Sequence, residues 1–167
     1  MQANTKIKQV ALTGLMGALA LVLAYLEGLL PPLPMLPPGA KIGLSNIVNM
    51  FAAGAAGLPS ALFIALIKGA FALFTRGAVA GVMSISGGVI STFAAWILLK
   101  KTGVSFITTG VICALCHNIA QLFAAYFITG AGMLAYAPSI VILGSCSGVL
   151  TGIALKLVYA RLNKIKL

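Results

Sequence analysis

The sequence predicts an all-α membrane protein that crosses the bilayer with six transmembrane helices, and three observations support this prediction. Hydrophobic residues make up 61% of the 167 residues and charged residues only 7%, whereas about 25% of the residues of a soluble domain are charged. Apolar stretches of about 20 residues, the length that crosses roughly 30 Å of hydrocarbon, recur along the whole chain. The basic residues cluster between these stretches. We therefore expect lipid, and not water, to surround the chain.

The predicted helices follow one another with short connections, so the chain is interpreted as one membrane domain, residues 1–167. Their approximate ranges are 10–30, 42–57, 59–75, 79–99, 104–128 and 137–159. The first follows basic residues, as the core of a secretory signal does, but it is longer and the later segments are equally apolar, which favours a retained helix. The second and third are short, and Pro59 suits the first turn of a new helix. A re-entrant hairpin is the alternative for this pair, and it leaves both termini on the same side.

The formal net charge of +10 comes from 11 basic residues and a single acidic residue, Glu27. A nucleic-acid partner is not expected, because the basic residues flank apolar stretches and form no polar face. If the amino terminus is cytoplasmic, the basic residues on that side are Lys6, Lys8, Lys100, Lys101, Lys156, Arg161, Lys164 and Lys166. Only Lys41 and Arg76 fall outside, and Lys68 lies within a span. The positive-inside rule thus predicts a multi-pass protein of the cell (cytoplasmic) membrane with both termini cytoplasmic.

Polar groups within the spans form two clusters, and such groups usually face the protein interior or a wet cavity. The clusters are Glu27, Lys41, Asn46 and Asn49, and Lys68, Cys113, Cys116, His117, Asn118 and Gln121. His117 and Gln121 share a helix face, about 20 to 26 Å from the cytoplasmic start of their helix, which is the depth expected for Glu27. We predict an outward-facing, substrate-binding pocket with Lys41 or Arg76 at its mouth. Its expected lining is Glu27, Asn46, Asn49, His117, Asn118 and Gln121.

The alternative for these polar groups is a network that locks the helices together. In that arrangement Lys41 or Lys68 neutralises Glu27. Lys68 is equally compatible with a position along the outside of its helix, where its side chain would reach toward the interface.

The segment 31–41 contains five of the seven prolines and is expected on the outside. Proline fixes φ and removes backbone donors, so a stiff, extended cap over a cavity is one interpretation. A simple stop between two helices is the other.

Small residues four positions apart recur in the spans, and helices in lipid associate through such faces. Most of these faces are expected to pack helices within the protein. On the first helix, Gly14, Gly17 and Ala18 lie close to the cytoplasmic side. We predict that this face docks a partner membrane subunit.

Cys113, Cys116 and His117 match the C-x-x-C-H pattern of covalent haem attachment. Here the pattern lies inside an apolar helix, and no second ligand cluster completes a metal site. The favoured interpretation is that the cysteines are small packing residues. We therefore expect no cofactor, no metal and no disulfide framework.

Three motifs stand in order along the chain: Tyr25-Leu26-Glu27-Gly28-Leu29-Leu30-Pro31-Pro32, Lys41-Ile42-Gly43-Leu44-Ser45-Asn46-Ile47-Val48 and His117-Asn118-Ile119-Ala120-Gln121. Together they resemble the bacterial Gx transporter family, whose members are often labelled heptaprenyl diphosphate synthase component I. The resemblance covers most of the chain, with one departure at Ala120, where a glycine is commoner. It maps the family pattern onto Glu27, Pro31, Lys41, Gly43, Asn46, His117, Asn118 and Gln121.

That family is similar to the S components of energy-coupling factor (ECF) transporters. The resemblance implies six helices, an external substrate pocket and a small-residue face on the first helix. It also implies a membrane coupling subunit and ATPases as partners. The function implied is that of a membrane-embedded subunit for uptake of a small molecule.

No enzymatic activity is expected of the chain alone. Common prenyl diphosphate synthases hold diphosphate through Mg²⁺ on clustered carboxylates, and this sequence has one carboxylate side chain. It also lacks the G-x-x-x-x-G-K-[ST] loop of ATP-binding proteins. Two alternatives remain: an accessory membrane subunit of a heptaprenyl diphosphate synthase or a quinone-related enzyme, and a self-contained carrier that uses Glu27 and His117.

Overall fold

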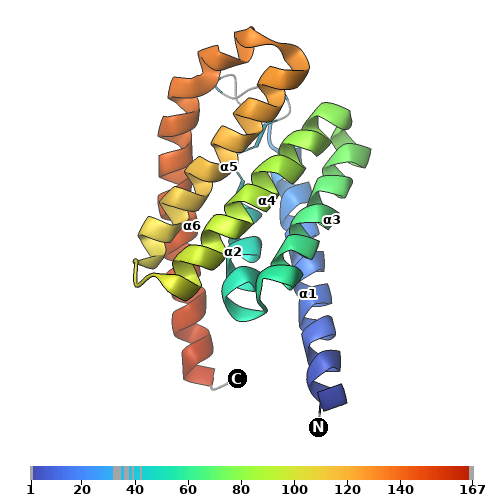
Figure 1. Cartoon of the computed structure of the whole chain (residues 1–167), viewed down its shortest axis with the longest axis vertical. Helices are drawn as coiled ribbons and strands as arrows, with labels where there is room; N and C mark the ends of the chain where they lie inside the picture. Colours follow the sequence, from blue (N-terminus) through green and yellow to red (C-terminus); the bar gives the residue numbers. More distant parts are fainter. Residues whose placement is uncertain (1, 32–34, 36–37, 39, 42, 166–167) are drawn as a thin grey trace.

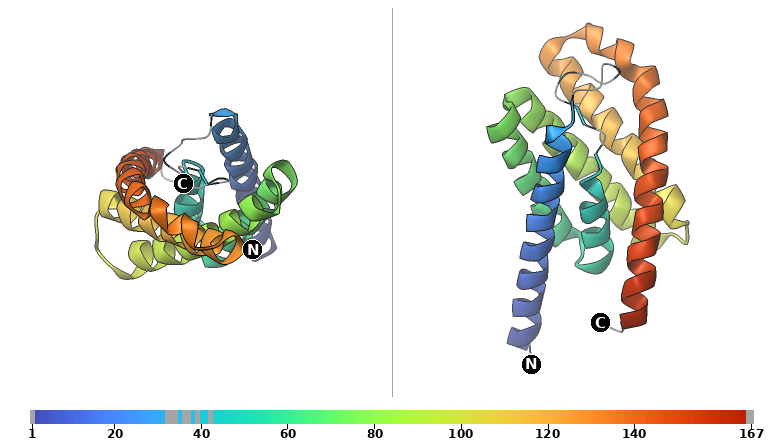
Figure 2. Two further views of the ribbon diagram at one scale, coloured as in Figure 1. Left: turned by 90° about the horizontal axis from the view of Figure 1, so that it is seen from above. Right: turned by 180° about the vertical axis from the view of Figure 1, so that it is seen from behind.

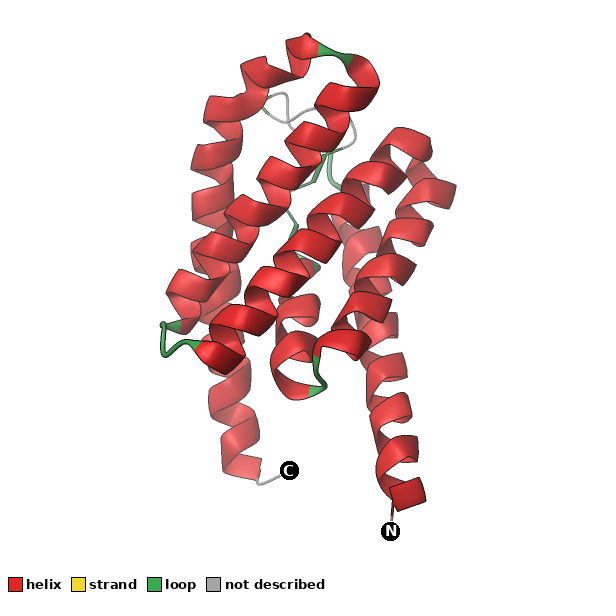
Figure 3. Cartoon of the chain, in the orientation of Figure 1, coloured by secondary structure: helices red, strands yellow, loops and turns green. Residues whose placement is uncertain are grey.

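The computed structural model describes residues 2–31, 35, 38, 40–41 and 43–165, and within these residues every regular element is a helix (Figure 3). The elements are α1 (Gln2–Leu29), α2 (Asn46–Ala55), α3 (Leu58–Arg76), α4 (Ala78–Lys101), α5 (Phe106–Thr129), the 3-10 helix η1 (Ala131–Tyr136) and α6 (Ala137–Ile165). The predicted all-α fold is confirmed. The segment 31–41, predicted as a cap over the cavity, lies largely outside the described residues, including Pro32, Pro34 and Pro37. Lys166 lies outside them as well.

Five helical segments of the described chain are long and apolar enough to cross a membrane, and α2 is the helix that is not among them. Its ten residues span about 15 Å at 1.5 Å per residue. The predicted range of 42–57 was therefore too long. The helix begins only at Asn46, because residues 43–45 enter the bundle as non-helical chain.

The helices form a bundle in which both termini lie at the same end (Figure 1). The chain pairs α3 with α4 and α5 with α6, and α4 packs against α5 between these pairs. Helix α1 packs on α3 and α2, and the views from two sides place the short α2 between α1 and α6 (Figure 2). The turns after Leu29, Arg76 and Thr129 lie at the end opposite the termini (Figure 1). Below, that end is called the far end.

Close backbone contact joins α5 and α6. A Cβ atom added to Gly152 would lie 2.7 Å from Ile107 Cα, so only glycine lets the two backbones approach this closely. Near the end that carries the termini, Tyr159 of α6 stacks on Phe106 with ring centroids 5.0 Å apart and meets Phe51 edge-on at 5.3 Å. These contacts fix the short α2 to the long helices.

The distribution of side chains is inverted relative to a soluble protein. Large apolar side chains such as Phe74 and Phe127, which are 86% and 80% exposed, cover the outside. Several charged and amide side chains lie inside: Glu27 is 7%, Lys68 4% and Gln121 5% exposed. Since an exposed apolar surface of this kind needs lipid, the fold is that of a multi-pass membrane protein.

Candidate functional site

The site is built around the point where non-helical chain enters the bundle. Gly43 has φ +87°, a conformation that favours glycine, and an added Cβ there would meet Asn46 Nδ2 at 2.8 Å. The backbone N–H groups of Gly43 and Leu44 both donate to Glu27 Oε1, Leu44 at 3.2 Å. In a membrane each unsatisfied backbone group costs several kcal/mol. The single carboxylate of the chain therefore holds this segment in place.

Lys41 crosses the end of α1 just before that entry. Its Nζ donates to the backbone carbonyl of Ala24 at 2.8 Å. The ammonium passes over Gly28, where a Cβ would lie 2.7 Å from Nζ, so a glycine permits this path. Burial lowers the pKa of Lys41 from its usual 10.5, Arg76 lowers it further, and Glu27 opposes both effects.

Lys68 of α3 points into the bundle and is not a lysine that runs along the outside. Its side chain is 4% exposed, and Nζ donates to Asn46 Oδ1 at the start of α2. Asn49, one turn further along α2, donates to Thr92 of α4 at 3.3 Å. The polar residues of α2 thus connect it to α3 and α4.

On α5, the Gln121 amide donates to His117 Nε2 at 2.9 Å. Because this nitrogen accepts, the neutral imidazole carries its proton on Nδ1. Nδ1 is buried and is directed at the backbone of Gly87, without a hydrogen bond of ordinary geometry. The ring lies against Gly87 of α4, where an added Cβ would come within 2.8 Å of Nδ1.

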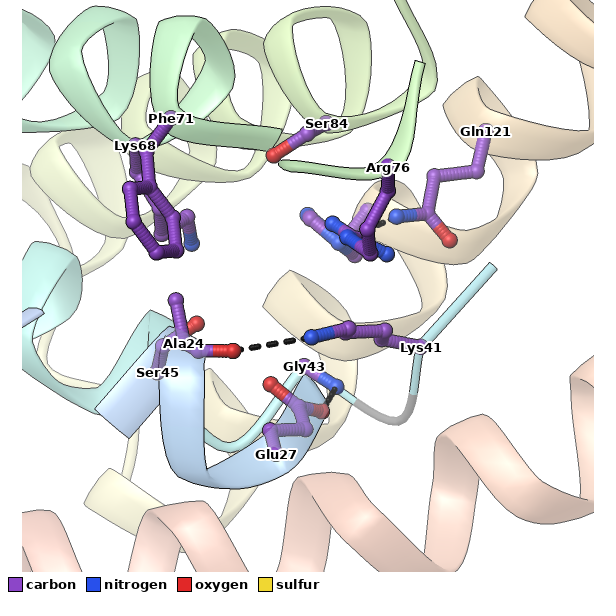
Figure 4. Close-up of a pocket in the computed structure, with 11 residues that line it drawn as sticks. Ala24, Glu27, Lys41, Gly43, Ser45, Lys68, Phe71, Arg76, Ser84 and Gln121 are labelled. Atoms are coloured by element: carbon purple, nitrogen blue, oxygen red, sulfur yellow. Dashed lines mark hydrogen bonds between the residues drawn. The ribbon is translucent and has the colours of Figure 1, made fainter. Parts of the chain in front are cut away.

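These side chains surround a partly open cavity toward the far end of the bundle (Figure 4). Its lining comprises Ala24, Glu27, Lys41, Gly43, Ser45, Lys68, Phe71, Arg76, Ser84, His117 and Gln121. The side chains of Lys41, Lys68 and Arg76 reach into the same space, with Glu27 below them (Figure 4). The cavity volume is about 20 Å³, which is room for about one or two water molecules. Binding of a larger molecule requires the long lining side chains to move.

The cavity brings together some of the residues proposed from sequence and leaves others apart. Glu27, Lys41, His117 and Gln121 line it, and Arg76 does so from the end of α3. The other three proposed residues do not line it. Asn46 contacts the lining residue Lys68, and Asn49 contacts Thr92 of α4. The Asn118 amide lies against Gly144 of α6.

Four neutral lining residues, Ala24, Ser45, Phe71 and Ser84, were not proposed from sequence. Phe71 lies three positions after Lys68 and therefore shares its helix face, so helical spacing could have predicted it. Neutral residues of this kind are common in membrane helices, and nothing in the pattern marks Ser45 or Ser84.

The cysteines lie away from this lining. Cys113 is buried in the apolar core, Cys116 is half-buried and Cys146 is exposed on α6, and all three are free thiols.

The small-residue face proposed for α1 borders a second, mostly apolar concavity. Gly14 and Ala18 are exposed, whereas Gly17 is buried. A groove of about 570 Å³ lies near the end that carries the termini. It is lined by Lys6, Gln9, Val10, Thr13 and Gly14 of α1 and by Pro59, Ser60 and Phe63 of α3.

The fold and the site define a class: a small polytopic helical membrane protein with a buried, charged cavity at the end opposite its termini. The chain belongs to the heptaprenyl diphosphate synthase component I family, whose model matches residues 16–158. Its fold is similar to a solved structure described as the S component of a bacterial ECF transporter, with 22% sequence identity, a TM-score of 0.75, and coverage of 96% of this chain and 98% of that chain. A comparison with curated proteins gave no match. The family resemblance and the fold predicted from sequence are both confirmed.

Proposed function

We propose that this protein is the substrate-binding subunit of a transporter that takes up a small molecule, and that it is not an enzyme. The fold it shares with an ECF transporter S component supports this proposal. The observation that carries it is the cavity itself, where ionisable groups from α1, from α3 and from the non-helical residues 40–41 and 43–45, here called the entry segment, converge inside an apolar bundle. Ionisable groups within a membrane protein mark substrate pathways by default.

The proposed orientation has both termini in the cytoplasm and the cavity opening to the exterior. The start of α1 and the ends of α4 and α6 lie toward the end that carries the termini (Figure 1). Most of the basic residues belong to these parts of the helices, including Lys6, Lys8, Lys100, Lys101 and Lys156. The positive-inside rule favours a cytoplasmic position for such an end. The cell membrane is the expected location.

Partner ATPase and membrane coupling subunits are proposed to supply the energy. The groove beside Gly14 is the expected docking surface, because it is apolar, faces lipid and lies on the proposed cytoplasmic side. A Cβ added to Gly14 meets no atom within 4 Å, so Gly14→Leu should leave the isolated subunit folded and fill the groove. Co-purified ATPase activity should then fall. Cys146→Leu, which adds bulk on the exposed face of α6, is the control that should retain it.

The direct test of substrate binding is native mass spectrometry of protein purified in a mild, uncharged detergent. We expect a retained small molecule on the 17.0 kDa chain. Gln121→Leu, which removes a polar group from the lining, should reduce its occupancy, whereas Thr129→Val at the exposed end of α5 should not. A chain that never retains a small molecule, even when enriched membranes are extracted gently, would contradict the proposal.

The family description favours a second candidate, an accessory membrane subunit of a heptaprenyl diphosphate synthase or a quinone-related enzyme. The chemistry of the chain argues against a catalytic part in it, because the only carboxylate accepts hydrogen bonds from its own backbone. Co-purification distinguishes the two candidates. ATPases and a coupling subunit support uptake, and a soluble prenyl synthase supports the accessory subunit.

A further inference from the structure

The cavity has an excess of positive charge. Among its lining residues, Lys41, Lys68 and Arg76 are cations and Glu27 is the one anion. With three cations and one anion, the lining has a net charge of +2. Isolated charges in a medium of low dielectric constant are costly unless a counter-charge accompanies them.

The hydrogen-bond partners of Glu27, Lys41 and Lys68 do not remove the excess. Glu27 Oε1 accepts from the backbone N–H groups of Gly43 and Leu44. The ammonium of Lys68 donates to the neutral amide oxygen of Asn46, and that of Lys41 donates to the neutral carbonyl of Ala24. Neutral oxygens satisfy a donor, but they do not balance its charge.

The three cations of the lining offer donors alone, whereas its side-chain acceptors are Glu27, the hydroxyls of Ser45 and Ser84 and the Gln121 amide oxygen. Lysine and arginine side chains donate hydrogen bonds and accept none. The Gln121 Nε2 donor is already directed at His117, and Nδ1 of the His117 ring lies against the backbone of Gly87. A phosphate or carboxylate offers only acceptor oxygens and a negative charge, and charge-assisted hydrogen bonds to lysine and arginine are roughly twice as strong as neutral ones.

We infer that the molecule bound in this cavity carries an oxyanion, a phosphate or a carboxylate, which Lys41, Lys68 and Arg76 hold together. This inference rests on the proposed function, because it names the chemical class of the substrate of the same site. The oxyanion lies between α3 and the entry segment, and the rest of the substrate extends toward the open side of the cavity. The group belongs to a soluble solute or to a lipid headgroup, and the test separates these sources.

The first experiment measures anion-dependent thermal stabilisation of purified protein in an uncharged detergent. The probes are inorganic phosphate, pyrophosphate and citrate, compared with chloride at equal ionic strength. At least one probe should raise the melting temperature in a saturable way. Lys68→Met should weaken the apparent affinity for that probe about tenfold or more, as expected for a buried charge contact.

The matched control is Lys100→Met, which removes the same charge from an exposed position at the last turn of α4. Its affinity for the probe should stay within about twofold of the parent protein, because exposed, distant charges are screened. Lys41→Met is a second cavity variant on a different segment and should also weaken binding, so the test does not depend on the folding of Lys68→Met. Equal losses in Lys68→Met, Lys41→Met and Lys100→Met would overturn the inference.

The second experiment identifies the retained molecule by native mass spectrometry of the parent protein, Lys68→Met and Lys100→Met. A soluble phosphate or carboxylate compound that Lys68→Met alone loses supports the inference. A phospholipid with that behaviour supports oxyanion recognition and contradicts uptake of a soluble solute. A retained neutral or cationic compound overturns the inference and leaves the proposed function intact. If nothing is retained and no probe stabilises the protein, the inference and the proposed function both fall.

Discussion

The role of Glu27 as the anchor of the entry segment makes a quantitative prediction. In Glu27→Ala, the buried N–H of Gly43 and the part-buried N–H of Leu44 lose their acceptor. A buried loss costs about 1–3 kcal/mol and a part-buried one about 1 kcal/mol, so the protein should lose about 2–4 kcal/mol of stability. In Glu27→Gln, the amide oxygen can still accept both bonds, but without the charge. The expected loss is then only about 1–2 kcal/mol, since charge-assisted bonds are roughly twice as strong.

Thermal unfolding in detergent, followed with a thiol-reactive fluorophore, measures this difference. Cys113 is 1% exposed and reacts only after the bundle opens. A Cys116→Ser, Cys146→Ser background removes the half-buried and the exposed thiol. For a chain of this size, 1 kcal/mol corresponds to about 2–4 °C in melting temperature. Glu27→Ala should therefore melt at least about 4 °C below the parent protein, and Glu27→Gln should fall between them. If Glu27→Ala melted within about 1 °C of the parent, the anchoring role would be refuted.

Three further predictions concern close contacts and pH. Gly87→Ala places a methyl group within 2.8 Å of the His117 ring and should destabilise the protein by about 1–3 kcal/mol, measured by the same thiol assay. Gly152→Ala pushes a methyl group against the α5 backbone and should cost a similar amount. The control is Gly132→Ala, which should be neutral because no atom lies within 4 Å of the new Cβ. Equal melting temperatures for the three variants would contradict the packing argument. The pKa of Lys41 is lowered from 10.5 in the folded protein. Between the lowered pKa and 10.5, the unfolded chain therefore binds more protons than the folded chain. The free energy of unfolding should rise with pH in this window. Anion binding should fall in the same window as the Lys41 charge is lost, and Lys41→Met should flatten this part of both pH profiles.

Helix positions were predictable where an apolar stretch ends at a residue that cannot continue it. The ranges 59–75, 79–99 and 104–128 lie within about two residues of α3, α4 and α5, because glycines and basic residues mark their ends. The second helix was not predictable in the same way. Hydropathy does not distinguish apolar helix from apolar non-helical chain, and the entry segment depends on Glu27, which lies 16 residues before Gly43.

The candidate site was predictable to the extent that ionisable groups within a membrane are rare. This rule singled out Glu27 and His117, and helical spacing placed Gln121 beside His117. Asn118 was grouped with them by sequence proximity, but adjacent helix residues point about 100° apart. Its amide accordingly lies against Gly144 of α6 and outside the cavity lining.

The late start of α2 has a consequence for how much solute this fold can accommodate. With ten helical residues, α2 covers about half of a hydrocarbon layer of roughly 30 Å, and the non-helical residues 43–45 precede it inside the bundle. The space available to a solute therefore depends on where α2 begins as well as on the side chains that line the cavity. Lengthening that helix by one or two turns toward its amino end would close the hollow, and delaying its start would enlarge it.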